Sequence, residues 1–220
     1  MKKRILLACI ALAGISLSAQ ETTNKNANTS SYESTDGKIK LDFGLKGGLN
    51  LSTLKSQLVV PGLDINESSS TNGTFFYVGV LLEFKELIKN RPSDKLGIEL
   101  LYNKTGGGDK GDLSSQDQII VPLVYKLSII DNLYAIGGAT PAFNIISNVD
   151  SVGGYFVATT GSTNTFDLYA SFGLEYELSY KLDIEARYNL GLLNNLKSNF
   201  YSGSSMKNRG LHIGISYSFK

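Results

Sequence analysis

The 220-residue chain has one cysteine and one histidine, so it holds few of the side chains that most metal and nucleophilic sites need. A metal centre normally takes several protein ligands, and a hydrolase needs a nucleophile or a metal beside its acidic residues. His212 is therefore expected to have a hydrogen-bonded structural role. No clustering of His, Cys or Ser supports catalysis, so we expect no enzymatic activity, no catalytic residue, no metal and no cofactor.

Apolar runs long enough to cross a membrane as a helix are also missing. The one extended run, Ile5–Leu17, is shorter than the roughly 20 residues that such a helix needs. It follows a charged run at residues 2–4 and ends near small residues, which is typical of a secretory signal peptide over residues 1–19. The segment before Cys9 superficially resembles a lipoprotein cleavage site, but it lies too close to the start. If Cys9 leaves with the signal, the mature chain cannot form a disulfide.

The chain has no large excess of charge of either sign. It contains 21 basic and 20 acidic residues. Removal of the three basic residues at 2–4 gives a net charge of about −2, which gives no support to a nucleic-acid partner. Residues 20–38 are rich in Asn, Thr, Ser and Glu and hold almost nothing apolar, so we expect a disordered periplasmic leader there.

What the chain does have is an alternation of apolar and polar residues in eight segments. They span Lys40–Leu51, Phe75–Lys85, Leu96–Asn103, Gln118–Ser128, Leu133–Ile146, Phe166–Glu177, Leu182–Gly191 and Leu211–Phe219. Each is close to the roughly 9 to 11 residues that a tilted strand needs to cross a bilayer. The pattern predicts an all-β fold: an eight-stranded antiparallel transmembrane up-and-down β-barrel over residues 39–220. Alternation also accounts for a mean hydropathy near zero, because half of each strand is polar.

The connections between these segments alternate between long and short. The long ones are Ser52–Thr74, Gly106–Asp117, Ser147–Thr165 and Leu193–Lys207, and the short ones are Leu87–Asp94, Ile129–Asn132 and Ser179–Lys181. Outer-membrane barrels have short periplasmic turns and longer outside loops, and an even number of strands brings both termini to one side. We therefore expect a protein of the outer membrane of a Gram-negative bacterium, surrounded by outer-membrane lipid, with periplasmic N- and C-termini.

Alternation alone does not say which face points inward, since a soluble lipocalin-like periplasmic carrier keeps its apolar side inside. The charged face also carries glycines, at Gly44, Gly48, Gly79, Gly97, Gly173, Gly191 and Gly214. On a water-exposed strand Gly packs nothing, whereas inside a tight barrel it makes room for a neighbour's large side chain. The charged face is therefore predicted to be the lumen. An interfacial aromatic belt is expected to include Tyr102, Tyr125, Tyr176 and Phe219.

The predicted lumen carries charges that must be paired or wetted. The structural lumen charges are predicted to be Lys46, Glu83, Glu99, Lys126, Glu175, Glu185 and Arg187. Arg187 is expected to bridge Glu175 or Glu185 and so to give a plugged interior. Eight strands leave an interior just filled by side chains, which disfavours the alternative of a small passive channel. Catalytic carboxylate pairs, as in an outer-membrane enzyme, are a further alternative without a supporting nucleophile.

Any binding function is expected in the outside loops. Their apolar residues are Leu58, Val59, Val60 and Leu63 in the first long connection and Tyr155, Phe156 and Val157 in the third. We interpret them as caps of the barrel mouth or as strand extensions, with contact to a protein partner as the alternative. Asp109 and Asp112 lie among glycines but lack the acidic repeat of a calcium loop. No ligand-binding residue is assigned.

Three short motifs carry a resemblance to a known family. They are YNLGLLN at Tyr188–Asn194, IVPL at Ile120–Leu123 and the closing segment Asn208–Phe219. In order and spacing they resemble the PorT-like outer-membrane β-barrel domain of Bacteroidota, over most of the chain after Lys38. The resemblance implies an eight-stranded outer-membrane barrel and, for the family's namesake, a link to protein secretion. Phe219 also resembles the C-terminal signal read by the barrel-insertion machinery, although Lys220 follows it. The leading hypothesis is a non-enzymatic barrel of structural or interaction type.

Overall fold

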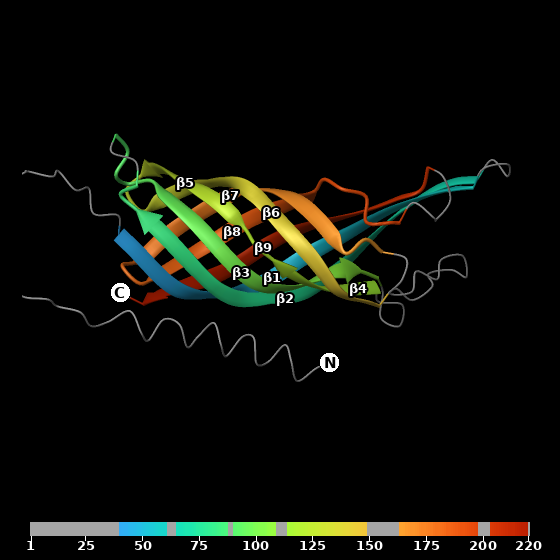
Figure 1. The fold of residues 1–220 in the computed structure, drawn as a ribbon, viewed down its shortest axis with the longest axis horizontal. Coiled ribbons are helices and arrows are strands. Elements are labelled where there is room, and N and C mark those ends of the chain that lie inside the picture. Colours follow the sequence, from blue (N-terminus) through green and yellow to red (C-terminus); the bar gives the residue numbers. More distant parts are fainter. Residues whose placement is uncertain are drawn as a thin grey trace, which may run out of the picture. The chain divides into compact units, whose positions relative to one another are not determined.

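The computed structural model describes residues 40–60, 65–87, 90–108, 114–148, 163–197 and 203–219. Its strands are β1 (Lys40–Val60), β2 (Ile65–Lys85), β3 (Lys95–Gly107), β4 (Ser114–Ile120), β5 (Leu123–Ile130), β6 (Leu133–Asn148), β7 (Phe166–Ser179), β8 (Leu182–Gly191) and β9 (Ser205–Phe219). The pairings between them are antiparallel, and β1 pairs with both β2 and β9, so the sheet closes into a barrel (Figure 1). The predicted up-and-down barrel is confirmed. Within the described residues no helix is long and apolar enough to span a membrane.

Strands β4 and β5 form one wall strand that a proline interrupts. On β3 the register runs from Leu101 opposite Ile120 to Ile98 opposite Leu123 without a shift, and both strands also pair with β6. Pro122 has no N–H group to donate to the ladder, although its carbonyl accepts a hydrogen bond from β3 at 2.9 Å. The barrel wall therefore has eight strands, as the alternation predicts.

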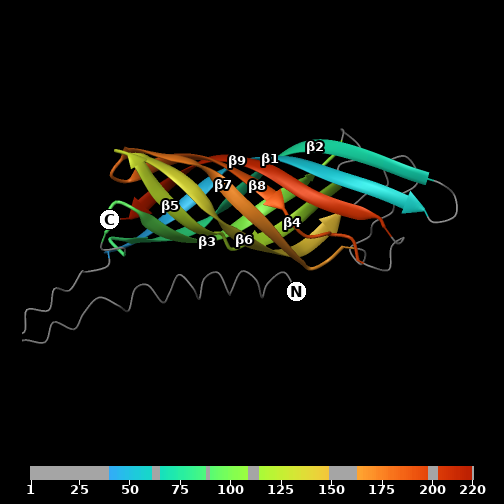
Figure 2. The same cartoon turned by 90° about the horizontal axis from the view of Figure 1, so that it is seen from above.

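Strands β1 and β2 continue past the rest of the wall as a long hairpin. Their register is unbroken from Lys40 opposite Lys85 to Val60 opposite Ile65, and Figure 2 shows the pair projecting at the end of the barrel away from the C-terminus. The prediction of a loop over Ser52–Thr74 is wrong. A strand beyond the bilayer has no lipid to face, so its sequence loses the apolar alternation while its backbone pairing continues. The interpretation of residues 58–60 as a strand extension is confirmed.

The other connections agree better with the sequence. The second long one is shorter than predicted, because β3 continues to Gly107 and β4 begins at Ser114. Between β5 and β6 the chain turns tightly, with Asn132 at a φ of 66°, a left-handed conformation that Asn tolerates better than most residues. The connection from β7 to β8 is equally short and lies at the end of the barrel where β1 begins and β9 ends.

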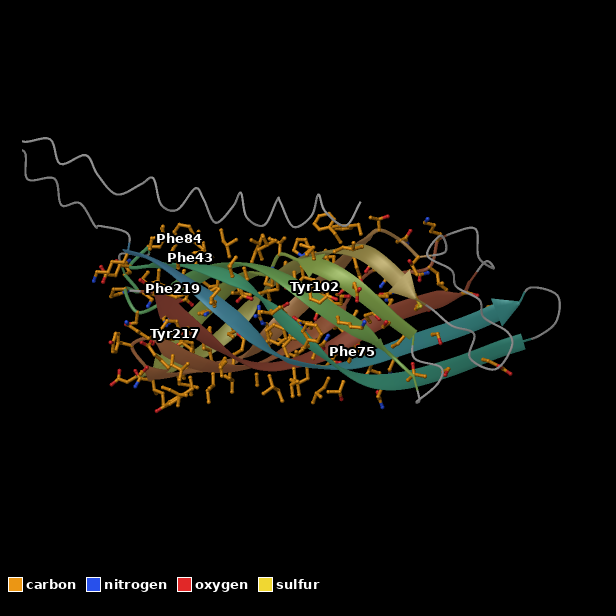
Figure 3. All side chains as sticks on the ribbon, turned by 90° about the horizontal axis from the view of Figure 1, so that it is seen from below. Phe43, Phe75, Phe84, Tyr102, Tyr217 and Phe219 are labelled. Carbon is orange, nitrogen blue, oxygen red and sulfur yellow. The ribbon has the colours of Figure 1, made fainter. Side chains whose placement is uncertain are left out.

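Apolar side chains cover the outside of the wall and charged ones the inside. Leu45, Leu174 and Ile215 are each 50% exposed or more, whereas Glu99 and Arg187 are 2% exposed or less. In Figure 3 carbon-only side chains project from the outer surface along the barrel. This arrangement contradicts the lipocalin-like alternative, in which the apolar face would fill the centre.

The inward glycines have two different reasons to lack a side chain. At Gly97 an added Cβ would press on the Val124 side chain, as predicted from the need for room. At Gly48 and Gly173 it would instead meet backbone atoms of the neighbouring strand. Room for a large side chain is therefore only part of the reason, and close approach of coiled strands is the other part.

Several predictions concern residues outside the described part of the chain. They are the signal peptide over 1–19 with Cys9, the leader over 20–38, the loop residues Leu63, Asp109, Asp112, Tyr155, Phe156 and Val157, and the C-terminal Lys220. These remain predictions.

Candidate functional site: the charged interior

Lys46, Glu99, Glu185 and Arg187 meet inside the barrel in what we call the Arg187 cluster. The Lys46 Nζ atom lies 2.7 Å from Glu99 Oε1 and 2.6 Å from Glu185 Oε2. The Arg187 Nη2 atom lies 2.7 Å from Glu99 Oε2 and 2.7 Å from Glu185 Oε1. The side chains come from β1, β3 and β8 and are almost fully buried. Two cations thus neutralise two carboxylates, and each carboxylate contacts both cations.

A second group, the Lys126 cluster, joins β2, β5 and β7. The Lys126 Nζ atom contacts Glu83 and lies 2.5 Å from Glu175 Oε2. Of the two partners predicted for Arg187, Glu185 is found and Glu175 is not. Glu175 and Glu185 face each other directly across β7 and β8, but different cations contact them: Lys126 contacts Glu175, and Lys46 and Arg187 contact Glu185.

Lys95 links the Lys126 cluster to the turn end of the barrel. Its Nζ atom lies 3.2 Å from Glu177 Oε2 and 4.0 Å from the centre of the Tyr134 ring, and its charge also acts on Glu83 and Glu175. The seven predicted lumen charges all lie inside the barrel and all take part in ion pairs. Buried charges are tolerated only with such partners. The ion pairs therefore allow charged side chains to fill this part of the barrel interior.

A ladder of amides lies inside the wall on β1, β3, β4 and β6. Asn50 Nδ2 donates to Asn103 Oδ1 at 3.0 Å, and Asn103 Nδ2 donates to Gln118 Oε1 at 3.0 Å. Gln118 Nε2 in turn donates to Asn144 Oδ1 at 2.8 Å. Sequence reasoning placed some of these residues on the polar face but did not predict the ladder. The signal that could have predicted the ladder is that these amides occupy inward positions of their strands. Buried polar groups are nearly always hydrogen-bonded, so neighbouring inward amides are expected to bond to one another.

Apolar side chains also point into the lumen, which the sequence analysis missed. The buried apolar group consists of Tyr77, Leu101, Ile120, Ala142 and Tyr169. Ile120 occupies an inward position of its strand, where the alternation of apolar and polar residues predicts a polar side chain. Its apolar side chain therefore weakened the predicted pattern and did not indicate a buried apolar group. The group fills volume that charges alone would leave to water.

His212 is buried inside the barrel and stacks on Tyr77. The two ring centres are 4.4 Å apart, with 15° between the ring planes. The His212 Nδ1 atom has no hydrogen-bond partner among the described residues, so the expected hydrogen bond is not found at that atom, and the face of the ring stacks on Tyr77 instead. Gly214 makes room for this arrangement, because a side chain there would collide with the Tyr77 hydroxyl.

At the hairpin end of the barrel, Asn195 and Leu196, which follow β8, contact residues of β1, β7 and β9. Leu54 packs with Leu196 and Met206 in a small buried group. Asn195 Nδ2 donates to Asp167 Oδ2 at 2.9 Å, and a bridge joins Thr163 to Leu196. Together these contacts hold the chain after β8 against the inner side of the wall at that end.

The opposite end is fastened by Asp94, in the turn before β3. Its carboxylate accepts hydrogen bonds from the Tyr125 hydroxyl and, at 3.0 Å, from the Ser128 amide, and Arg91 Nε lies 3.0 Å away. Burial acts to raise the pKa of Asp94, but the hydrogen bonds from Tyr125 and Ser128 and the Arg91 charge hold that pKa below its usual value. The ionised carboxylate therefore fastens the turn to β5.

Aromatic side chains form an outward belt at the ends of the apolar surface. Figure 3 shows Phe43, Phe84, Tyr217 and Phe219 gathered at one end and Tyr102 farther along the wall. Phe43 and Phe219 stack with ring centres 6.0 Å apart, and Tyr217 lies edge-on to Phe219 at 5.4 Å. Such belts mark membrane–water interfaces.

In the described part of the chain, no group of three or more His, Cys, Asp or Glu side chains is placed to hold a metal ion.

Comparison with known proteins gives one family match: a family model described as "Outer membrane protein beta-barrel domain" matches residues 7–219. A search of curated proteins finds no match.

Several solved structures are similar in fold. Neisserial surface protein A is 14% identical with a TM-score of 0.50, over 80% of this chain and 97% of that one. Ail, the attachment invasion locus protein of Yersinia pestis, is 15% identical with a TM-score of 0.35, over 79% of this chain and 98% of that one. OprG from Pseudomonas aeruginosa is 13% identical with a TM-score of 0.36, over 83% and 98%. The likeness to Neisserial surface protein A concerns the fold alone.

Proposed function

Because this chain belongs to the family of outer membrane protein β-barrel domains, we propose that it serves the outer membrane as a non-enzymatic barrel of structural or interaction type. The observation that carries this proposal is the filled interior. The Arg187 and Lys126 clusters pair the seven lumen charges, and the amide ladder and the buried apolar group occupy the space beside them. Transport through the centre is not part of the proposed role.

Conductance tests the filled interior. Purified protein in planar bilayers is expected to give no stepwise current, because an eight-stranded barrel packed with side chains has no continuous water path. A variant with Lys46→Ala, Glu99→Ala and Arg187→Ala, which empties the middle of the barrel, is the positive control for detection. Stepwise current from the unmodified protein that persists through repeated purification would overturn the proposal in favour of a passive channel.

The orientation in the membrane is part of the same proposal. The N- and C-termini lie on the periplasmic side, and the β1–β2 hairpin lies outside the cell. The two-residue turns between β5 and β6 and between β7 and β8, both at the end where β1 begins, support this arrangement, since outer-membrane barrels keep their short turns in the periplasm. An epitope inserted between β1 and β2 should be labelled on intact cells, whereas one placed after Phe219 should need permeabilised cells. The reverse labelling would refute the orientation.

An interaction role requires a partner, and the hairpin is the surface that we assign to it. We place the chain among the PorT-like barrels of Bacteroidota on its sequence motifs, and with them in a process linked to protein secretion. The barrel-insertion machinery is a further partner during biogenesis, through the C-terminal aromatic Phe219. Cross-linking in native membranes, followed by mass spectrometry of captured neighbours, tests the partner. Unchanged secretion in a deletion strain would remove the secretion link while leaving the barrel proposal intact.

A further inference from the structure

A cluster of basic side chains lies on the outer wall just beyond the apolar surface. On β1 the outward apolar residues end at Leu51, and Lys55 follows on the same face. On β9 they end at Leu211, after which Arg209 and Lys207 face outward towards the hairpin end. Lys55, Lys207 and Arg209 form what we call the basic rim patch. It lies where the hydrocarbon of the membrane gives way to headgroups.

The register sets two like charges directly against each other in this patch. Lys55 is the cross-strand partner of Lys207, and Arg209 is opposite Thr53, one outward position closer to the membrane. Directly opposed side chains have Cβ atoms only about 5 Å apart, and like charges in that position are destabilising. On the other neighbouring strand, β2, the partners of Lys55 and Thr53 are Ser70 and Asn72, which carry no charge.

Elsewhere on the same rim, a lysine is paired with a carboxylate on the neighbouring strand. Lys104 on β3 is the cross-strand partner of Asp117 on β4, and the Lys104 Nζ atom lies 3.5 Å from Asp117 Oδ1. Lys104 is therefore neutralised within the wall. No carboxylate of the described residues forms a salt bridge with Lys55, Lys207 or Arg209.

The guanidinium of Arg209 gives an independent sign of a missing partner. Its Nε atom is buried, and among the described residues no acceptor reaches it. A buried donor without an acceptor is destabilising. The two Nη atoms of an arginine are further donors, in the planar fork that matches a phosphate group, and Arg209 is less than fully buried.

We propose that the basic rim patch binds the phosphate groups of a lipid headgroup in the outer leaflet. The lipid chains lie along the apolar surface below Leu51 and Leu211, and the phosphate bridges Lys55 and Lys207 and accepts hydrogen bonds from Arg209. The bound anion turns a repulsive pair into an attractive triad. The assignment to the outer leaflet rests on the orientation given under Proposed function, whereas the binding of lipid phosphate does not.

The test is lipid binding by the purified, folded barrel in a neutral detergent. Bis-phosphorylated lipid A is the probe, and binding is measured by native mass spectrometry. Neutralising the patch with Lys55→Gln, Lys207→Gln and Arg209→Gln is expected to weaken binding at least tenfold. The matched control, Lys104→Gln with Asp117→Asn, removes charges from the same rim and is expected to leave binding within twofold. Equal binding by the patch variant and the unmodified barrel would overturn the proposal.

A second variant guards against a fold defect. Lys207→Glu places an opposite charge against Lys55, so it is expected to raise the unfolding midpoint without lipid and to weaken lipid A binding. If Lys207→Glu instead lowers the midpoint or leaves binding unchanged, the repulsive pair is not what the lipid relieves, and the proposal fails.

Competition experiments show whether the bound phosphate belongs to a lipid, to free phosphate or to a surface polymer. Inorganic phosphate at millimolar concentration is expected to leave lipid A bound, and lipid A lacking its phosphates is expected to bind at least tenfold more weakly. If a soluble sulfated polysaccharide displaces lipid A at an equal concentration of charge, the patch binds a surface polymer and the lipid assignment is wrong. Conductance and epitope labelling test the proposed function separately, so a failure there is distinguishable from a failure of lipid binding.

Discussion

Lys46 and Arg187 share both of their carboxylate partners inside the barrel. Each of the two cations lies within 2.7 Å of Glu99 and of Glu185. The two carboxylates lie on β3 and β8, and Lys46 lies on β1, so the cluster ties three wall strands together through the lumen. Loss of either cation leaves two buried carboxylates with a single positive charge.

Removing Arg187 should therefore destabilise the barrel. Arg187→Leu is expected to lower the free energy of unfolding by about 3–5 kcal/mol, the cost of leaving a buried charge without its partner. Urea unfolding in lipid vesicles measures it. Lys40→Ala breaks the exposed pair with Glu86 and is the control, with an expected loss of less than about 1 kcal/mol. An unchanged unfolding midpoint for Arg187→Leu would show that the cluster does not stabilise the fold.

The outward apolar surface predicts a response to charge that a soluble protein would not show. Ile215 is 56% exposed and lies midway along the outward face of β9. Ile215→Arg is expected to cost about 2–4 kcal/mol in a bilayer, the range for Arg at the midplane of a barrel. Ser68→Arg, on the part of β2 beyond the apolar surface and opposite the uncharged Gln57, should cost less than about 1 kcal/mol. If both substitutions cost the same small amount, the surface does not face hydrocarbon.

The packing of Gly97 against Val124 predicts that a larger residue at one of these positions is compensated by a smaller residue at the other. Gly97→Ala places a methyl group against the Val124 side chain and should lower stability by about 1–3 kcal/mol, as overpacking does. Val124→Ala alone should also destabilise, because it leaves a cavity. The double variant should recover part of the combined loss, which a double-mutant cycle of unfolding free energies would reveal. Strict additivity would mean that the two positions do not compete for space.

The lowered pKa of Asp94 predicts a pH dependence at the turn before β3. A carboxyl group whose pKa is lower in the folded state stabilises fully above its unfolded pKa of about 3.9, and this stabilisation is lost as the pH falls through the folded value. Asp94→Asn should therefore be less stable than the unmodified barrel at pH 7, and the difference should shrink towards pH 3. Unfolding midpoints at both pH values measure it. Tyr125→Phe removes one donor to the carboxylate and should reproduce part of the effect.

Much of the fold could be predicted because a bilayer imposes a simple rule on a strand. Phe43, Leu45 and Leu49 must face hydrocarbon while Lys46 and Asn50 face the lumen, and this difference is visible at a period of two residues. The rule ends where the bilayer ends. The β1–β2 hairpin beyond Leu51 has no such constraint, so its length was missed.

The interior was predicted only in part for a different reason. Parity fixes which side chains point inward, but the partner of each depends on how far the strands are staggered around the barrel. Arg187 therefore reaches Glu99, 88 residues away in sequence, while Glu175 pairs with Lys126. Ile120 and Leu101 were missed because a lumen of eight strands needs apolar volume as well as charge, and alternation carries no information about which inward positions supply it.

The ion pairs of the lumen also bear on how the protein reaches its native state. Lys46 and Glu185 are 139 residues apart and approach each other only when β9 has joined β1. Before that seam forms, the interior carboxylates need water, because a lone ion in hydrocarbon costs several kcal/mol. A partly assembled sheet thus cannot rest inside the bilayer. Entry into the membrane and closure of the seam between the first and last strands must occur together.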